Sequence, residues 1–403
     1  MRPQRGSWRE LDRRVWQLAF ARAVNTMGLS LVMSFLGIYI VETRGYAAWI
    51  YGVIALGANL GQSLTSAWAG NLSDRIGRKP LITTALFVRA FFIALLGTQI
   101  ALDAPLWSLA LNMMITSALR GCFEPVAYAL VADVVADDQR IAAFGLQRMG
   151  TNLGWTVGPA LGGLLTLVMS YGYVFYFAAF GMIVAGFVAL RVEDPVTRNS
   201  RPPAKSDDLW TALREAARDA RMRLLLAGTF LAALIGTQMF STLAIYMTDE
   251  LHLTKADVGL LYMLNGAGVL ALQVPALGLI HRFGIARTLP LSSILDAIAF
   301  SMIGAATGFL GAAAAMVAIT AAEVVFNPAH QTAIAEAADP VRRGRAYGVV
   351  AFVQMVGIAL APLFGGVLFD TIGDHHLAMW MTIGVIGLLQ TLCFSAFVRR
   401  RRV

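Results

Sequence analysis

The fold is decided by the stretch Arg120–Gly163, which reads RGCFEPVAYALVADVVADDQRIAAFGLQRMGTNLGWTVGPALGG. Charged residues sit inside an apolar run, a short charged turn follows, and a helix with regularly spaced glycines comes next. The design returns 203 residues further on, with Phe326 in the place of Phe123 and Glu336 in the place of Asp133. The other aligned pairs are Pro125/Pro328, Arg140/Arg343, Gly145/Gly348, Gly154/Gly357, Pro159/Pro362, Gly162/Gly365 and Gly163/Gly366. The chain therefore contains an internal repeat of about half its length.

The composition is that of a polytopic membrane protein. Of the 403 residues, 58% are hydrophobic and 14% are charged, and the mean hydropathy is +0.66. A typical globular domain is about 45–50% apolar and about 25% charged. The excess lies in blocks of roughly 20–27 residues, each long enough to cross about 30 Å of hydrocarbon. Twelve spans are expected near residues 15–41, 49–70, 80–102, 106–132, 141–167, 173–191, 223–247, 257–279, 288–308, 312–337, 345–369 and 376–398.

Together with the repeat, these spans predict an all-α integral membrane fold, with twelve transmembrane helices in two pseudo-symmetric six-helix bundles. The N-terminal bundle is expected over 1–191, a cytoplasmic linker over 192–222, and the C-terminal bundle over 223–403. An amphipathic helix is expected in the linker, either on the anionic membrane surface or packed against the bundle. Two related bundles of membrane helices are typical of secondary transporters.

Lys and Arg are distributed unevenly among the predicted loops. Of the 32 basic residues, 26 lie at the termini or in one alternate set of loops, and only Arg44 and Lys255 lie in the other set. This asymmetry is the positive-inside pattern, so both termini of this multi-pass chain are expected on the cytoplasmic side of a cell (inner or plasma) membrane. The net charge of +8 therefore reports topology, and we expect membrane lipid instead of nucleic acid beside it.

The residue clusters that an enzyme or a metal site needs are not found in the sequence. Cys122 and Cys393 fall inside predicted spans, and the five histidines are scattered apart from His375 and His376. No metal-ligand spacing, nucleophile constellation or phosphate-binding loop is recognisable. We therefore expect no enzymatic activity, no metal and no cofactor, with a proton as the coupling ion and the electrochemical gradient as the energy source. Nothing in the sequence requires more than a monomer.

A conspicuous loop follows the second span, where Gly70–Leu81 reads GNLSDRIGRKPL. It resembles the signature loop of the major facilitator superfamily, G-x-L-x-D-R-x-G-R-K/R-x. The resemblance implies a cytoplasmic gate in which an acid faces the amino end of span eleven, where the helix dipole favours negative charge. For Asp133 and Arg140 the alternative is that they are solvated charges at helix ends. The gate residues implied are Gly70, Asp74, Arg75, Gly77, Arg78, Asp133 and Arg140.

The second copy of this loop, Gly278–Gly284, roughly keeps the glycine spacing but lacks the acid. The resemblance therefore implies an asymmetric gate, in which the loop of the first half does most of the work.

Span five resembles the motif G-(x)8-G-(x)3-G-P-(x)2-G-G of the twelve-span drug/proton antiporters in this superfamily. Glycines at four-residue steps allow helices to approach closely, and a proline removes one backbone hydrogen bond. Packing alone remains an alternative for the glycines, since none can carry a proton. The resemblance also implies the direction of export. The matching residues are Gly145, Gly154, Gly158, Pro159, Gly162 and Gly163.

Charged residues inside spans are costly in a membrane and are therefore candidates for function. Arg120 and Glu124 lie one helical turn apart in span four, and the repeat carries them to Glu323 and Asn327 in span ten. Burial disfavours a charged carboxylate, whereas a nearby cation favours it. We therefore expect Glu323 to be the main proton-coupling carboxylate, with Glu124 and Arg120 as further coupling residues. A fixed bridge between helices is the alternative.

Three further charges lie inside the predicted spans and are given structural roles. Arg89 in span three corresponds to Asp296 in span nine, 207 residues later, and both are expected in peripheral helices as structural or gate support. Arg22 lies near the cytoplasmic end of span one and is expected to extend its head to the membrane interface.

The expected cavity wall carries polar side chains for a small-molecule substrate: Asn25, Gln147, Arg148, Asn152, Gln238, Asn265, Asn327 and Gln354. Aromatic and methionine side chains near them suit bulky amphipathic ligands of variable shape. We therefore predict a secondary active transporter that works by alternating access and couples proton entry to efflux of amphipathic drug-like compounds. A dedicated metabolite or (lyso)lipid transporter of the same fold is the alternative, followed by a sensor that does not transport.

Overall fold

The structure, a computed structural model, describes residues 11–136, 139–193, 209–338, 343–372 and 374–400. These residues form helices joined by short turns, with no strand among them. The first half contains α1 (Arg13–Ile38), the π-helical turn η2 (Tyr39–Thr43), α2 (Ala48–Ile76), α3 (Arg78–Ala101), α4 (Leu106–Val134), α5 (Arg140–Val168) and α6 (Tyr171–Leu190). The second half contains α7 (Leu209–Arg218), α8 (Ala220–Gly236), η3 (Thr237–Phe240), α9 (Thr242–Asp249), α10 (Lys255–Phe283), α11 (Ile285–Ile303), α12 (Gly308–Ala337), α13 (Arg343–Ile372) and α14 (His376–Arg399).

Nine helical segments within the described ranges are long and apolar enough to cross a membrane. One of them, Ala220–Asp249, is built from α8, η3 and α9 together. The helices α2, α4 and α5 complete the set, with 29 residues each. At about 1.5 Å per residue each is long enough to span a bilayer. The all-α, twelve-helix membrane fold predicted from the sequence is confirmed.

The helices cluster into two compact units. Unit 1 consists of Met1–Leu36, Ile54–Pro203 and Val258–Met263, and unit 2 consists of Gly37–Val53, Ala204–Asp257 and Leu264–Val403. The sequence thus divides inside the predicted linker. Each unit also includes one short segment from the other half of the chain.

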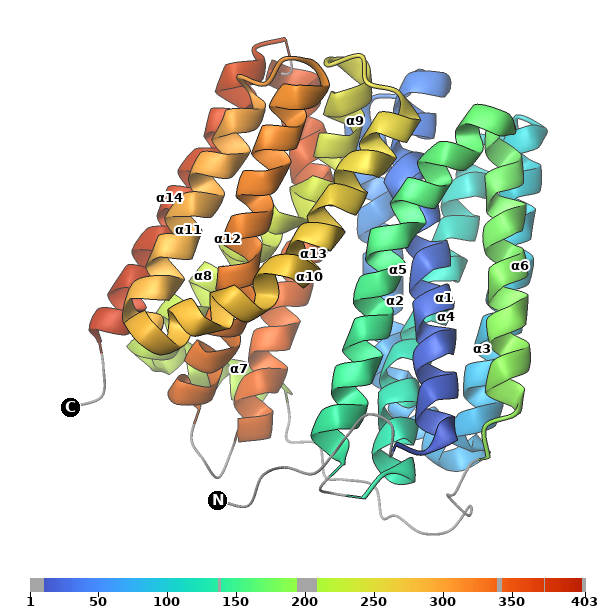
Figure 1. Cartoon of the computed structure of the whole chain (residues 1–403), viewed down its shortest axis with the longest axis horizontal. Helices are drawn as coiled ribbons and strands as arrows, with labels where there is room; N and C mark the ends of the chain where they lie inside the picture. Colours follow the sequence, from blue (N-terminus) through green and yellow to red (C-terminus); the bar gives the residue numbers. More distant parts are fainter. Residues whose placement is uncertain (1–10, 137–138, 194–208, 339–342, 373, 401–403) are drawn as a thin grey trace. The chain divides into compact units, whose positions relative to one another are not determined.

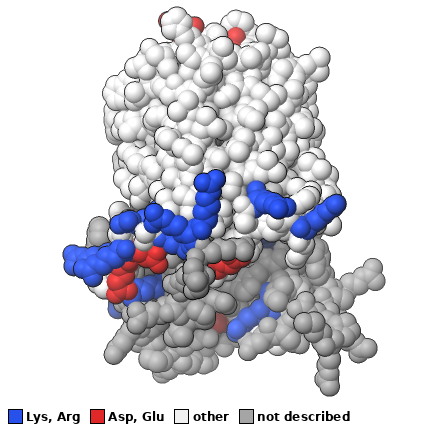
Figure 2. Space-filling model, turned by 90° about the vertical axis from the view of Figure 1, so that its left-hand side faces the viewer, with Lys and Arg blue, Asp and Glu red and all other residues white. Residues whose placement is uncertain are grey.

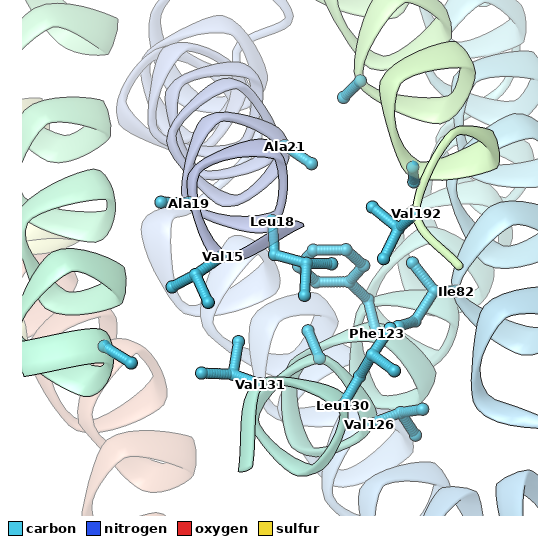
Figure 3. Packing of buried hydrophobic residues seen from close by; sticks show 14 of the residues in the cluster. Val15, Leu18, Ala19, Ala21, Ile82, Phe123, Val126, Leu130, Val131 and Val192 are labelled. Atoms are coloured by element: carbon cyan, nitrogen blue, oxygen red, sulfur yellow. The ribbon is translucent and has the colours of Figure 1, made fainter. Parts of the chain in front are cut away.

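In unit 1, α3 lies along α6 and α4 (Figure 1). Glycines let α3 and α6 touch, because a Cβ placed on Gly97 would lie 2.6 Å from the carbonyl oxygen of Gly172. A buried apolar cluster fills the space between the helices and includes Leu18, Phe123 and Val126 (Figure 3). The Phe123 ring projects from α4 toward Leu18 of α1. This packing fixes the position of the next residue, Glu124.

In unit 2, α11 lies between α12 and α14 (Figure 1). A Cβ on Gly387 of α14 would lie 2.6 Å from the Cβ of Ala297, so the glycine allows this close approach. The linker helix α7 packs against α13. Its Ala212 is buried, and its Glu215 pairs with Arg345 at 2.9 Å. The linker helix thus contacts the C-terminal half of the chain, and its place at the membrane surface stays a prediction.

Charged side chains are segregated on the face shown in Figure 2. Lys and Arg gather in a band near one end, and the surface beyond it is almost free of charge until a few acidic residues at the opposite end. In unit 2, exposed arginines lie at neighbouring helix ends: Arg282 of α10, Arg287 of α11, and Arg399 and Arg400 at the end of α14. An uncharged belt above a basic band is the surface expected of a membrane-spanning helix bundle.

Candidate functional site

The predicted gate begins at a turn whose backbone strongly favours glycine. Gly77 joins α2 to α3 with φ 96°, and Gly284 joins α10 to α11 with φ 72°. Residues with a side chain rarely adopt positive φ, so glycine permits the next helix to start at once. The second copy of the loop therefore keeps the chain reversal although it lacks the acid.

A buried ion pair follows this turn in unit 1. Arg78, the first residue of α3, pairs with Asp133 near the end of α4, and both side chains are 7% exposed. Because water is largely excluded from the pair, breaking it by removing either side chain should be costly. Arg75 and Arg140 are exposed at helix ends. The Asp74 side chain and the surroundings of Gly70 lie outside the part of the chain that the structure describes. The gate function of this group stays a prediction.

Arg22 does not extend to the membrane interface, contrary to expectation. Its side chain is 1% exposed, and its Nη1 lies 2.5 Å from Oε2 of Glu124. Its Nε donates a hydrogen bond to Gln147 at 3.1 Å, and its guanidinium lies 3.8 Å from the centre of the Tyr128 ring. The expectation was wrong because the interior of unit 1 supplies a carboxylate, an amide and an aromatic face, which together replace water around the cation.

Two more arginines lie near this carboxylate. The Nε of Arg120 is 3.9 Å from Oε1 of Glu124, and its Nη1 donates to Gln62 at 3.3 Å. Arg89 is fully buried and donates to the side-chain oxygen of Asn25. The predicted partnership of Arg120 and Glu124 is thus present within a larger network. In this network the side-chain oxygens of Asn25 and Gln147 each accept a hydrogen bond from an arginine. Contact of these two residues with a substrate stays a prediction.

The glycines of α5 allow close contact with α1. Those that meet α1 follow one another at four-residue steps: Gly150, Gly154, Gly158 and Gly162. A Cβ on Gly158 would lie 2.6 Å from the Met27 carbonyl oxygen, and the Ser30 hydroxyl donates to the Gly154 carbonyl at 2.9 Å. Gly145 has no other atom within 4 Å of such a Cβ. Gly150, which lies outside the motif, could have been found from the four-residue step.

Unit 2 contains a cavity of about 210 Å³ that opens to the outside. Glu323 of α12 lines it, together with Asp296 of α11. Asn265 donates a hydrogen bond to Glu323 Oε2 at 3.3 Å, and Asn327 donates to Oε1 at 3.4 Å. The remaining lining residues are Thr229, Ala232, Ala233, Gly236, Thr237, Met239, Phe240, Phe300, Ile319, Phe326, His330, Gln331, Gln354 and Ile358.

The residues predicted for the substrate cavity are found in several places. Asn327 and Gln354 line the cavity of unit 2. Asn265 is not among the lining residues, but it donates a hydrogen bond to Glu323. Gln238 is fully buried, and its amide donates to the Ala361 carbonyl at 2.9 Å. In unit 1, Arg148 is exposed and Asn152 is partly buried. Substrate contact by these residues stays a prediction.

The sequence also matches known families and structures over nearly its whole length. It matches the profile of the Major Facilitator Superfamily over residues 18–249 and 225–403. It is 28% identical over 399 residues to the multidrug resistance protein MdtH of Photorhabdus laumondii, covering 96% of this chain and 94% of the relative. It is 23% identical over 397 residues to the MFS-type transporter YqjV of Bacillus subtilis, covering 98% and 95%.

Among solved structures, a variant of the nucleoside transporter NupG is similar with a TM-score of 0.77 at 12% identity, over 96% of this chain and 100% of that one. A POT family transporter in complex with 5-aminolevulinic acid gives 0.76 at 14% identity, over 97% of both chains. At these identities the structural similarity shows the fold alone. The sequence match and the all-helical membrane fold together describe a transporter, not an enzyme. The chain belongs to the major facilitator superfamily.

Proposed function

We propose that the chain is a proton-coupled exporter of amphipathic, drug-like compounds, with Glu323 as its main coupling carboxylate. The observation that carries this proposal is the position of Glu323. It lies in the middle of α12, lines the cavity of unit 2, and accepts hydrogen bonds from Asn265 and Asn327.

The surroundings of Glu323 suit a group that alternates between two protonation states. The amide donors stabilise the ionised form, whereas the position within a membrane-spanning helix favours the neutral form. A carboxyl balanced in this way responds to a change in the exposure of the cavity. Proton release to one side and uptake from the other follow when the cavity is open to each side in turn.

The cavity wall also fits the proposed class of substrate. The rings of Phe240, Phe300 and Phe326 supply apolar surface, and the amides of Asn327 and Gln354 supply polar contacts. A few polar groups on a mostly apolar wall are typical of small-molecule sites. The α5 glycine motif supports the antiport mechanism by resemblance, and the name of the relative MdtH supports drug efflux by similarity.

We also propose that both termini face the cytoplasm. The arginines at the ends of α10, α11 and α14 support this orientation, because basic residues concentrate on the cytoplasmic side of membrane proteins.

The proposal is tested with purified protein in liposomes under an imposed pH gradient. Lipophilic cations, neutral drugs, sugars and lysolipids are offered in turn, and both substrate movement and proton flux are followed. We expect the drugs to accelerate proton flux, and Glu323→Gln to abolish the coupled exchange. Glu42→Gln is a matched control, because Glu42 is exposed in η2 and lies outside the cavity lining.

Three outcomes would contradict the proposal in different parts. Full proton-driven exchange by Glu323→Gln would remove the role of this carboxylate. A response to one metabolite or to lysolipids alone would replace drug efflux by a dedicated transport function. Substrate binding without any movement of substrate or protons would replace transport by a sensing function.

A further inference from the structure

A second carboxylate shares the cavity of unit 2 with Glu323, and it comes from a different helix. Asp296 lies in the middle of α11, which packs along α12. Asp296 and Phe300 are one helical turn apart, and both line the cavity. The cavity is therefore bounded by acids on two adjacent helices, although the sequence predicted a coupling role only for the one on α12.

Asp296 is poorly placed for a structural role. No hydrogen bond or ion pair joins it to another described residue, although it lies within a membrane-spanning helix. Its sequence counterpart Arg89 donates instead to Asn25. In such a position the ionised form of an aspartate is costly unless a cation lies beside it, and the protonated form avoids this cost.

The two carboxylates also act on each other. Asp296 and Glu323 line the same cavity from adjacent helices, so like-charge repulsion disfavours ionisation of both at once. Acids that interact in this way lose their protons in two steps that belong to the pair. When both carboxyls are protonated, a positive charge entering between them offsets this repulsion and favours release of both protons.

The other titratable group that faces this pair is His330, also of α12. Its Nε2 lies 2.7 Å from the Thr229 hydroxyl, which itself donates to the Leu225 carbonyl at 2.8 Å. Which of the two groups donates in the contact between His330 and Thr229 depends on the tautomer of the imidazole. The described lining contains no Lys or Arg, so Asp296, Glu323 and His330 are the titratable side chains of the cavity.

We infer that Asp296 is a second proton-carrying group of this cavity, so that binding of a cationic substrate releases two carboxyl protons instead of one. In each carboxyl the O–H bond breaks, the electron pair stays on oxygen, and the proton passes to water in the cavity. Both carboxylates are protonated again after the substrate has left. This inference rests on the proposed proton-coupled function.

The first test measures the charge that moves in one cycle. With ethidium as a monovalent cationic probe, exchange for one proton moves no net charge, whereas exchange for two protons moves one. A membrane potential of 100 mV would then change the accumulation ratio by about fiftyfold, and Asp296→Asn should lose this response while pH-driven exchange remains. Wild-type exchange that ignores the potential overturns the inference, and so does a full response in Asp296→Asn.

The second test does not depend on transport. Infrared absorption of protonated carboxyl groups is followed in the purified protein while the pH is changed, without any ligand. We expect Asp296→Asn to lose one titrating component and to shift the remaining one to lower pH, because the repulsion is gone. Asp296→Glu should restore the component, and Asp249→Asn is the control, since Asp249 is exposed at the end of α9. If Asp296→Asn retains the same titrating component that the Asp249→Asn control retains, the inference is refuted.

The two readouts separate the inference from the proposed function. If the infrared titration shows both carboxyls but no compound drives proton flux, the proposed export fails and Asp296 remains a proton-binding group. If Glu323→Gln keeps coupled exchange and Asp296→Asn loses it, the main role passes from Glu323 to Asp296.

Discussion

Substitution of Gly158 by alanine tests whether the glycine motif of α5 serves close packing. A Cβ at this position would lie 2.6 Å from the Met27 carbonyl oxygen and 2.0 Å from the Ser30 hydroxyl oxygen. Ordinary contacts begin at 3.4 Å, so α1 would have to move away by about 0.8 Å. The Ser30 side chain would also have to turn, which breaks its 2.9 Å hydrogen bond to the Gly154 carbonyl.

These contacts set the expected magnitude. Overpacking of a close contact costs about 1–3 kcal/mol, and loss of the hydrogen bond adds about 0.5–1.5 kcal/mol. Gly145→Ala is the matched control, because it changes a glycine of the same motif and helix but meets no atom within 4 Å. It should be neutral or should stabilise the protein by up to about 1 kcal/mol, since alanine favours helix.

The measurement is thermal unfolding in detergent, together with proton-coupled transport in liposomes. Gly158→Ala should unfold at a clearly lower temperature than wild type, and a second substitution, Ser30→Gly, should recover only part of the loss because the contact with Met27 remains. If Gly158→Ala and Gly145→Ala unfold alike, close packing does not explain the motif. Normal stability with lost coupling would instead assign the glycines to the transport cycle.

Three further predictions concern charges that the structure describes. Arg78→Met should destabilise the protein by about 3–5 kcal/mol in equilibrium unfolding because it breaks the buried ion pair with Asp133, and addition of Asp133→Leu should recover much of this loss. Glu124→Leu should cost a similar amount because it removes the carboxylate of the buried Arg22, whereas Glu124→Gln should cost less because an amide oxygen still accepts a hydrogen bond; equal effects of the two would contradict this. Asp370 accepts from the first two backbone amides of α2 at 3.0 and 2.7 Å, so its change to alanine should cost about 1 kcal/mol and speed hydrogen exchange at the start of α2, with asparagine intermediate.

The sequence was sufficient for the fold because that information is local and repeated. Apolar runs of spanning length define the helices, and a tight turn such as that at Gly77 needs a glycine that is visible in the sequence. The membrane position of Glu323 could be predicted for the same reason, since a charge inside an apolar run stands out.

The errors and omissions concern contacts between helices, which no single run of sequence contains. Arg22 was expected at the interface because its partners Glu124 and Tyr128 are about 100 residues away in the sequence. Asp296 was given a structural role through its repeat partner, yet it lines the cavity beside Glu323. A repeat relates positions in two halves, but the packing around each position is specific to its own half.

The make-up of the two units has a consequence for dividing the protein. Unit 2 includes Gly37–Val53, which Asp370 holds at the start of α2, and unit 1 includes Val258–Met263, where a Cβ on Gly259 would lie 2.6 Å from the Pro159 carbonyl oxygen. A cut between residues 203 and 204 would therefore yield two fragments that each lack a piece of their own core. We expect the fragments to be degraded when produced singly and to accumulate when produced together, which protein levels in cells would show. The two halves of the sequence therefore do not coincide with the two units that fold.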